Sequence, residues 1–117
     1  MNIEEYRDYC ITKKGVTEAF PFDESTLVFK VMGKMFALTG VDSFDYINLK
    51  CDPENAVELR EQYNGVKPGY HMSKVHWNSV YLNSDVSDKI VYDLIDNSYQ
   101  LVVNSLTKKL QAELNNL

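Results

Sequence analysis

The clearest structural signal in this chain is the segment TLVFKVMGKMFALT, which spans residues 26–39. Residues that favour β-strands dominate both halves of the segment. Between them, Gly33-Lys34 places a glycine at the first central position of a two-residue turn, as type II′ geometry requires. A two-residue turn fixes the strand register, so Val31 should face Phe36. One face of this β-hairpin then collects the large apolar side chains Leu27, Phe29, Val31, Phe36 and Leu38.

The segment before the hairpin begins with helix signals. Asn2 is a suitable N-cap, and Glu5 stands three residues later, as in a capping box. A helix is therefore expected over residues 3–14, and Gly15 ends it.

Residues 18–23, Glu-Ala-Phe-Pro-Phe-Asp, follow this helix and predict an aromatic loop. Pro21 restricts its own backbone and that of the residue before it, which disfavours a continued helix. Because aromatic side chains more often pack than bind, Phe20 and Phe22 are expected to fill the core. A clamp on a ligand is the alternative for this pair.

The rest of the chain alternates strand and helix signals. A helix begins at Asp52-Pro53, where Asp suits the N-cap and Pro the first helical position. The other expected elements are a strand over residues 46–51, a short extended piece over 70–72, a strand over 76–82 and a long amphipathic helix over 87–106. Residues 110–117 either continue that last helix or fray. The order of helix, three strands, helix, two strands, helix predicts a two-layer α+β fold, with an antiparallel sheet packed against helices in a single domain, 1–117.

Composition excludes some classes of protein. The chain has 117 residues and a formal net charge of −5, which argues against a generic nucleic-acid binder. It contains no apolar run of about 18 residues, so no membrane span is expected. Its first residues lack the basic start and apolar core of a signal peptide. We therefore expect a cytoplasmic protein, and a monomer.

Few residues suggest catalysis or metal binding. His71 and His76 are five residues apart, which matches no common metal-site spacing, and no Asp, Glu or Cys lies between them. Cys10 and Cys51 have no CxxC partner and are expected to be buried, reduced thiols. Glycine-rich phosphate loops and nucleophile elbows are absent from the sequence. The sequence therefore predicts no cofactor, no metal site and no enzymatic activity.

One window differs from this acidic chain. No Asp or Glu occurs from Gln62 to Ser84, although the window holds both histidines and the only tryptophan. Lysines, aromatics and amides suit phosphate contacts combined with stacking. The candidate nucleic-acid-binding residues are Lys67, His71, Lys74, His76, Trp77 and Asn78, with Lys30 and Lys34 of the hairpin as further phosphate contacts. The alternative is a loop in which Trp77 packs in the core and the lysines are simply solvated.

Four ordered segments resemble the MmcQ/YjbR family. They are FPF at 20–22, VxKVxGKxFAL at 28–38, KPGYHMxKxHWNxV at 67–80 and LIDxSYxLVV at 94–103. The resemblance implies a two-layer α+β fold, similar to that of type III secretion chaperones and also described as CyaY-like.

Members of that family are commonly labelled DNA-binding proteins, so the resemblance implies a non-enzymatic protein with DNA as its partner. The alternative is a chaperone-like module that binds a protein segment. Its support is the acidic charge and the half-apolar outer sheet face expected to carry Val28, Met32, Met35 and Tyr46. The His/Trp cluster alone would support an enzyme acting on a small molecule.

Overall fold

The computed structural model describes residues 1–117 and has the expected α+β fold. One six-stranded sheet has the order β1-β2-β3-β4-β6-β5, and every neighbouring pair is antiparallel. The elements in chain order are α1 (Ile3–Ile11), β1 (Val16–Ala19), β2 (Thr26–Val31), β3 (Lys34–Gly40), β4 (Tyr46–Lys50), α2 (Pro53–Gln62), β5 (Val66–Pro68), β6 (Trp77–Tyr81), α3 (Asp88–Ser105) and α4 (Lys108–Asn115). The predicted order is retained, with β1 and α4 added to it.

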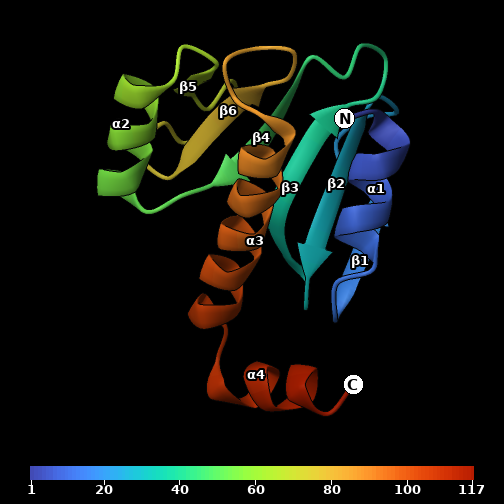
Figure 1. Ribbon diagram of the computed structural model, residues 1–117. Helices are drawn as coiled ribbons and strands as arrows, with labels where there is room; N and C mark the ends of the chain where they lie inside the picture. Colours follow the sequence, from blue (N-terminus) through green and yellow to red (C-terminus); the bar gives the residue numbers. More distant parts are fainter.

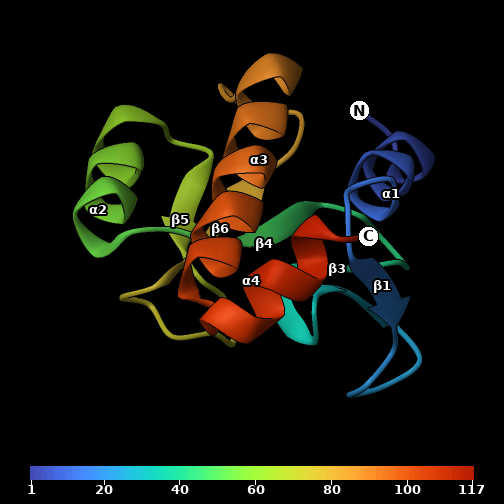
Figure 2. The same cartoon turned by 90° about the horizontal axis from the view of Figure 1, so that it is seen from below.

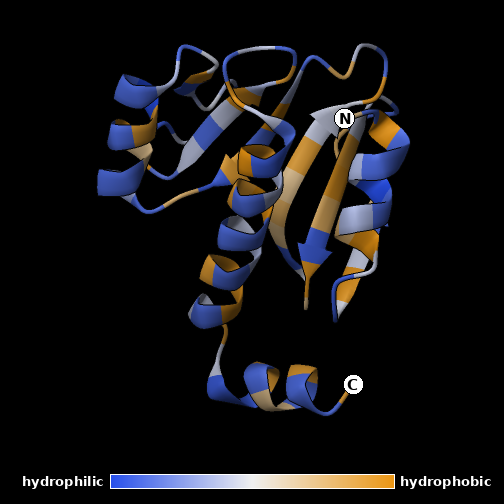
Figure 3. Ribbon diagram, viewed as in Figure 1, coloured by the Kyte–Doolittle hydropathy of each residue, from blue (hydrophilic) through white to orange (hydrophobic).

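The helices cover one face of the sheet. In Figure 1, α3 crosses the middle of the sheet, α1 lies over β1 and β2, and α2 stands beside β5 and β6. The second view shows α1, α2 and α3 on the same side of the strands (Figure 2). In Figure 3 the orange colour follows β2 and β3, whereas the helices carry alternating orange and blue bands, as amphipathic helices do. The opposite face of the sheet therefore has no helix on it.

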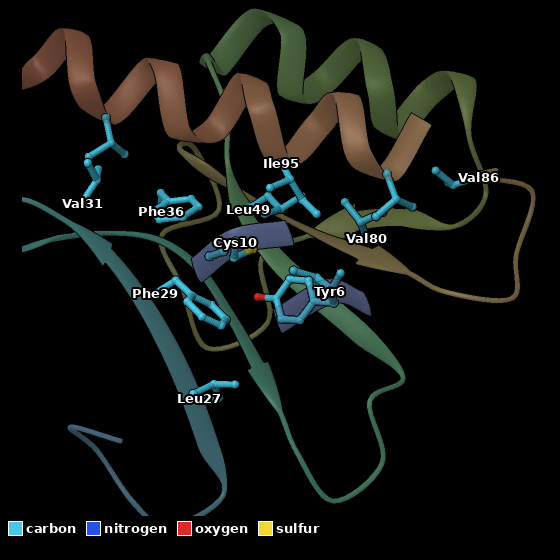
Figure 4. Close-up of a cluster of buried hydrophobic side chains, with 14 of the residues drawn as sticks. Tyr6, Cys10, Leu27, Phe29, Val31, Phe36, Leu49, Val80, Val86 and Ile95 are labelled. Atoms are coloured by element: carbon cyan, nitrogen blue, oxygen red, sulfur yellow. The ribbon is translucent and has the colours of Figure 1, made fainter. Parts of the chain in front are cut away.

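The main core lies between the sheet and these helices. Strand residues Phe29, Phe36 and Leu49 face Ile95 of α3 and Tyr6 of α1 (Figure 4). The rings of Tyr6 and Phe29 meet edge to face, with centroids 5.5 Å apart. Each of these side chains is at most 2% exposed, so together they supply much of the hydrophobic stabilisation.

Capping residues define the helix boundaries. Asn2 and Glu5 form the expected capping box, and the side chain of Asp52 accepts a hydrogen bond from the Asn55 N–H. The first helix ends at Ile11, earlier than predicted, because Gly15 (φ +74°) already leads into β1.

The end of the chain forms a separate helix. The tail neither extends α3 nor frays: Leu106 is extended, and Thr107 caps α4. Leu114 of α4 is buried in the main core, which ties the end of the chain to the domain.

The hairpin forms, but its predicted register is wrong. The turn is Met32-Gly33, with φ of +49° and +87°, the signs that a type I′ turn requires. Lys34 therefore pairs with Val31. The register then shifts at a β-bulge, because Lys30 pairs with Met35 whereas Phe29 pairs with Ala37. The bulged Phe36 and its neighbour both enter the main core.

This shift sends Leu38 to the opposite face of the sheet. There it packs with Val28 and Trp77 in a small second cluster. The expectation that Leu38 joins the main core is therefore corrected.

The hydroxyl of Ser98 on α3 bridges β3 and β4 where their pairing ends. The paired register stops at Ala37 and Leu49. Beyond it, Ser98 Oγ donates to the Phe36 carbonyl (2.5 Å) and accepts from the Lys50 N–H (2.9 Å). Ser98 is completely buried, so one helix side chain serves two backbone groups inside the core.

Two loop predictions also need correction. Phe20 and Phe22 are 50% and 63% exposed, because β1 pairs with β2 only as far as Ala19 and the chain then leaves the sheet. Residues 70–72 form a turn, and the extended segment is instead β5, Val66–Pro68.

Candidate functional site on the open face of the sheet

On the helix-free face of the sheet, called the open face below, the strands place lysines and no carboxylates. Strands β2 to β6 contain no Asp or Glu, and the register places Lys30, Lys50 and Lys67 on this face. Lys34 pairs with Val31 of the main core and therefore lies on the helix side. The one strand acid, Glu18 of β1, is held by Arg7 of α1 at 2.6 Å. On a chain of net charge −5, most carboxylates therefore lie on helices and connections.

The segment 69–76, called the cover loop below, folds back over this face. Ser79 Oγ accepts from the Tyr70 N–H (2.9 Å) and donates to Asn48 Oδ1 (2.5 Å), and Asn48 Nδ2 donates to the Tyr70 carbonyl (3.1 Å). Lys74 Nζ donates to the Gly69 carbonyl at 2.8 Å. Asn48 and Ser79 are buried polar residues whose side chains bond to each other and to the loop. The cover loop is thus fixed to the strands by side-chain hydrogen bonds.

Gly69 is required where the cover loop leaves β5. A Cβ at this position would lie 2.8 Å from the Cβ of Trp77 and 2.9 Å from its carbonyl oxygen. Only glycine allows the backbone to approach β6 this closely.

A pocket of about 410 Å³ lies between the cover loop and the β1–β2 connection. Its walls are Phe22, Asp23, Thr26, Leu38, Thr39, Gly40, Tyr46, Asn48, Tyr70, His71 and Met72. The rings of Tyr46 and Tyr70 meet edge to face, with centroids 6.1 Å apart. The centroid of the His71 ring lies 4.0 Å from that of Tyr70. His71 itself adopts a left-handed backbone, with φ of +60°. The pocket is therefore bordered by aromatic rings from three separate parts of the chain.

One carboxylate lines this pocket. Asp23 Oδ1 accepts from the backbone N–H groups of Ser25 (2.8 Å) and Thr26 (2.7 Å). These hydrogen bonds lower the pKa of Asp23 below its usual value, so the group stays ionised. The pocket thus contains a fixed negative charge, whereas the lysines lie outside it.

Four of the predicted site residues are exposed on or near the open face, and Lys34 is exposed elsewhere. His71 lines the pocket, Lys67 lies on β5, and Lys74 and His76 belong to the cover loop. Lys34 lies at the distant hairpin turn. Lys30 of β2 is partly buried on the open face.

Trp77 and Asn78 are interior residues. Trp77 is 7% exposed and packs on Val28 and Leu38, in agreement with the alternative prediction that its side chain is buried. Asn78 is 2% exposed and points to the helix side, where it accepts from Arg60 Nε (2.7 Å) and donates to the Ala56 carbonyl (3.3 Å). The prediction that Asn78 contacts a ligand is corrected, since its amide holds α2 against β6.

Sequence reasoning did not select most of the pocket. Phe22 had been assigned to the core, and Asp23 and Tyr70 lie in connections whose folding together no local pattern reveals. One sequence signal for the pocket was available. Asn48 and Ser79 are polar residues inside strands of strong β-formers, and such residues, when buried, need hydrogen-bond partners nearby.

The remaining chemistry is limited. No group of three or more His, Cys, Asp or Glu side chains is placed to hold a metal ion. Both cysteines are free and buried, as expected, and burial raises the pKa of Cys10 to about 12. None of the helices is both long and apolar enough to cross a membrane.

The fold and these sequence motifs identify the class of protein. The family model described as YjbR matches residues 11–101, so the chain belongs to the YjbR family. It is 36% identical over 110 residues to Uncharacterized protein YjbR of Escherichia coli K12, with 93% of each chain covered. It is 42% identical over 91 residues to Uncharacterized protein YbdF of Escherichia coli O157:H7, covering 77% of this chain and 75% of that one.

Solved structures share the fold. The Deinococcus radiodurans protein DR2400, described as a DUF419 domain, has a TM-score of 0.91 and 36% identity, with 97% of this chain and 88% of that chain covered. A Pseudomonas syringae protein has a TM-score of 0.71 and 31% identity, with 86% of this chain and 98% of that chain covered. These similarities define the family and the fold of the chain.

Proposed function

We propose that this protein binds DNA, without catalysing a reaction, through the open face of its sheet and the cover loop. The observation that carries the proposal is the charge distribution. Strands β2 to β6 place three lysines and no carboxylate on the open face, although the whole chain has a net charge of −5. A surface of this kind attracts phosphates locally, while the acidic helices keep other faces from binding them.

Binding through lysines has a characteristic dependence on salt. Each phosphate that a lysine neutralises releases condensed counterions, so log K falls with log salt by roughly 0.9 per contact on duplex DNA and about 0.7 on single strands. Contacts by the three open-face lysines would therefore give a slope of about −2 to −3.

The test is fluorescence anisotropy with labelled oligonucleotides at several salt concentrations. The variant carries Lys30→Glu and Lys67→Glu on the open face, and the control carries Lys108→Glu and Lys109→Glu on α4. Each pair changes the net charge by the same amount. We expect the open-face variant to lose affinity by at least about tenfold. The magnitude of its salt slope should decrease by about 1.4 to 1.8, the value for two contacts. The control should change little in either quantity. Equal effects of both pairs would reject the open face as the DNA-binding surface.

A protein partner is the second candidate, and exposed apolar side chains favour it. Phe20 and Phe22 on the β1–β2 connection and Tyr70 and Val75 on the cover loop are 50–63% exposed. Exposed apolar residues that cluster on one side mark interaction sites. This function predicts a complex that survives about 0.5 M salt, because burial of apolar surface is not screened. Replacing Phe20 and Phe22 together by Ser should abolish the complex, as measured by co-purification with a tagged partner.

A further inference from the structure

We propose that the pocket beside the cover loop accepts one unpaired nucleobase, so that the protein prefers single-stranded DNA to duplex. This inference rests on the proposed function and names its substrate class. It is carried by the pocket's size, its aromatic walls and the separation between its carboxylate and the lysines.

The size and walls of the pocket suit one planar heteroaromatic ring. Its volume of about 410 Å³ falls within the range of roughly 300–1,000 Å³ of small-ligand sites. Phe22 enters from the β1–β2 connection, Tyr46 from β4, and Tyr70 and His71 from the cover loop. Aromatic side chains beside a positive surface are what proteins use to stack the bases of single strands.

The charges indicate which part of a nucleotide enters. The ionised Asp23 would repel a phosphate inside the pocket, but it can accept a hydrogen bond from the amino group of a base. Lysines lie outside the pocket on the same face. Asn48 in the pocket wall pairs with Ser79, and Ser79 pairs with Lys67. Two strand spacings of about 4.8 Å therefore separate the wall from Lys67, roughly 10 Å in all. A base in the pocket leaves its backbone free to meet that lysine.

The pocket exists before any ligand arrives. The hydrogen bonds of Asn48 and Ser79 hold the backbone of Tyr70 on both sides. A site that is already formed loses less entropy on binding than one that must order. In a duplex the bases are stacked and paired, and extruding one costs a few kcal/mol. The same surface therefore binds single strands more tightly than duplex at equal salt.

The experiment compares three labelled oligonucleotides of equal length by fluorescence anisotropy. They are a mixed-sequence single strand, its duplex, and a strand whose central nucleotides are abasic but keep their phosphates. We expect the complete strand to bind at least about tenfold more tightly than the duplex. It should bind roughly 5- to 150-fold more tightly than the abasic strand, the range that stacking of one base on aromatic side chains contributes.

Matched variants locate the base. Phe22→Ser removes a pocket wall, whereas Phe20→Ser alters another exposed phenylalanine of the same connection, which lies outside the pocket. Tyr70→Ser removes a second pocket wall, on the cover loop. Phe22→Ser and Tyr70→Ser should weaken binding of the complete strand by about 5-fold or more and leave the abasic strand unchanged. Phe20→Ser should change neither.

Two results would overturn the inference, and they differ in what they say about DNA binding. If all three oligonucleotides bind equally and lose affinity in Lys30→Glu/Lys67→Glu, the open face binds DNA but the pocket takes no base. If none of them binds at about 50 mM salt, both the pocket inference and the DNA-binding function are rejected.

Discussion

Replacing Ser98 by Ala tests how strongly α3 holds the sheet at the bulge. The buried hydroxyl donates to the Phe36 carbonyl and accepts from the Lys50 N–H. Without it, both backbone groups lose this partner in a part of the core that excludes water. Each unsatisfied buried group costs about 1–3 kcal/mol, so we expect the free energy of unfolding to fall by about 2–6 kcal/mol. That is a large part of the roughly 5–15 kcal/mol of a typical domain.

Urea denaturation followed by circular dichroism measures this loss. With a slope of roughly 1–3 kcal/mol per molar urea, the midpoint should fall by about 1 M or more, with the slope unchanged. Ser105→Ala is the matched control on the same helix, since its hydroxyl is exposed and donates only to the Val102 carbonyl. We expect the control to change stability by less than about 0.5 kcal/mol.

A loss below about 0.5 kcal/mol for Ser98→Ala would refute the reasoning. It would mean that β3 and β4 close over the gap and that the Lys50 N–H bonds directly to the Phe36 carbonyl. The hydroxyl would then be a replaceable spacer, and the end of the β3–β4 pairing would not depend on α3.

Two further predictions concern α4 and the thiol of α1. In urea titrations, Gly15→Ala should lower the free energy of unfolding by more than Gly33→Ala does. Both glycines have positive φ, but only at Gly15 would the new Cβ lie 2.5 Å from Leu114. Equal losses would show that backbone strain of about 1–2 kcal/mol explains both. Burial raises the pKa of Cys10 from 9.0 to about 12. Between these pH values the folded state keeps a proton that the unfolded state releases. The stabilisation that is present below pH 9 is therefore lost between pH 9 and 12. From pH 8 to pH 10.5, the free energy of unfolding of the native protein should therefore fall by up to about 2 kcal/mol more than that of Cys10→Ala, as measured by urea titrations. If the two proteins differ in stability by the same amount at both pH values, the buried-thiol interpretation is contradicted.

Local signals predicted much of the fold because they are short-range. The cap at Asn2 depends on residues within one helical turn, and the Asp52-Pro53 start of α2 does likewise. The hairpin was recognisable from its β-formers and its glycine. Its register was not, since it depends on Met32 adopting positive φ and on the bulge at Phe36. Both follow from packing of the whole sheet rather than from the hairpin.

The candidate site was predictable only in part for a related reason. The acid-free window did mark the cover loop, and His71 does line the pocket. Yet Trp77 and Asn78 alternate on β6, so one side chain packs on the open face and the other points to α2. The partner of Asn78 is Arg60, 18 residues away, and no nearby pattern identifies that pair. Phe22 and Asp23 likewise reach the pocket only through the pairing of β1 with β2.

The order of the strands leaves β1 and β5 at the two edges of the sheet, and both edges are short. β5 has three residues and ends in Pro68, which has no N–H to donate, and β1 has four residues and is followed closely by Pro21. An extended peptide that added itself to either edge would gain only a few main-chain hydrogen bonds. Strand addition is therefore a poor route to any partner, and concentrated solutions of the protein should resist edge-to-edge aggregation.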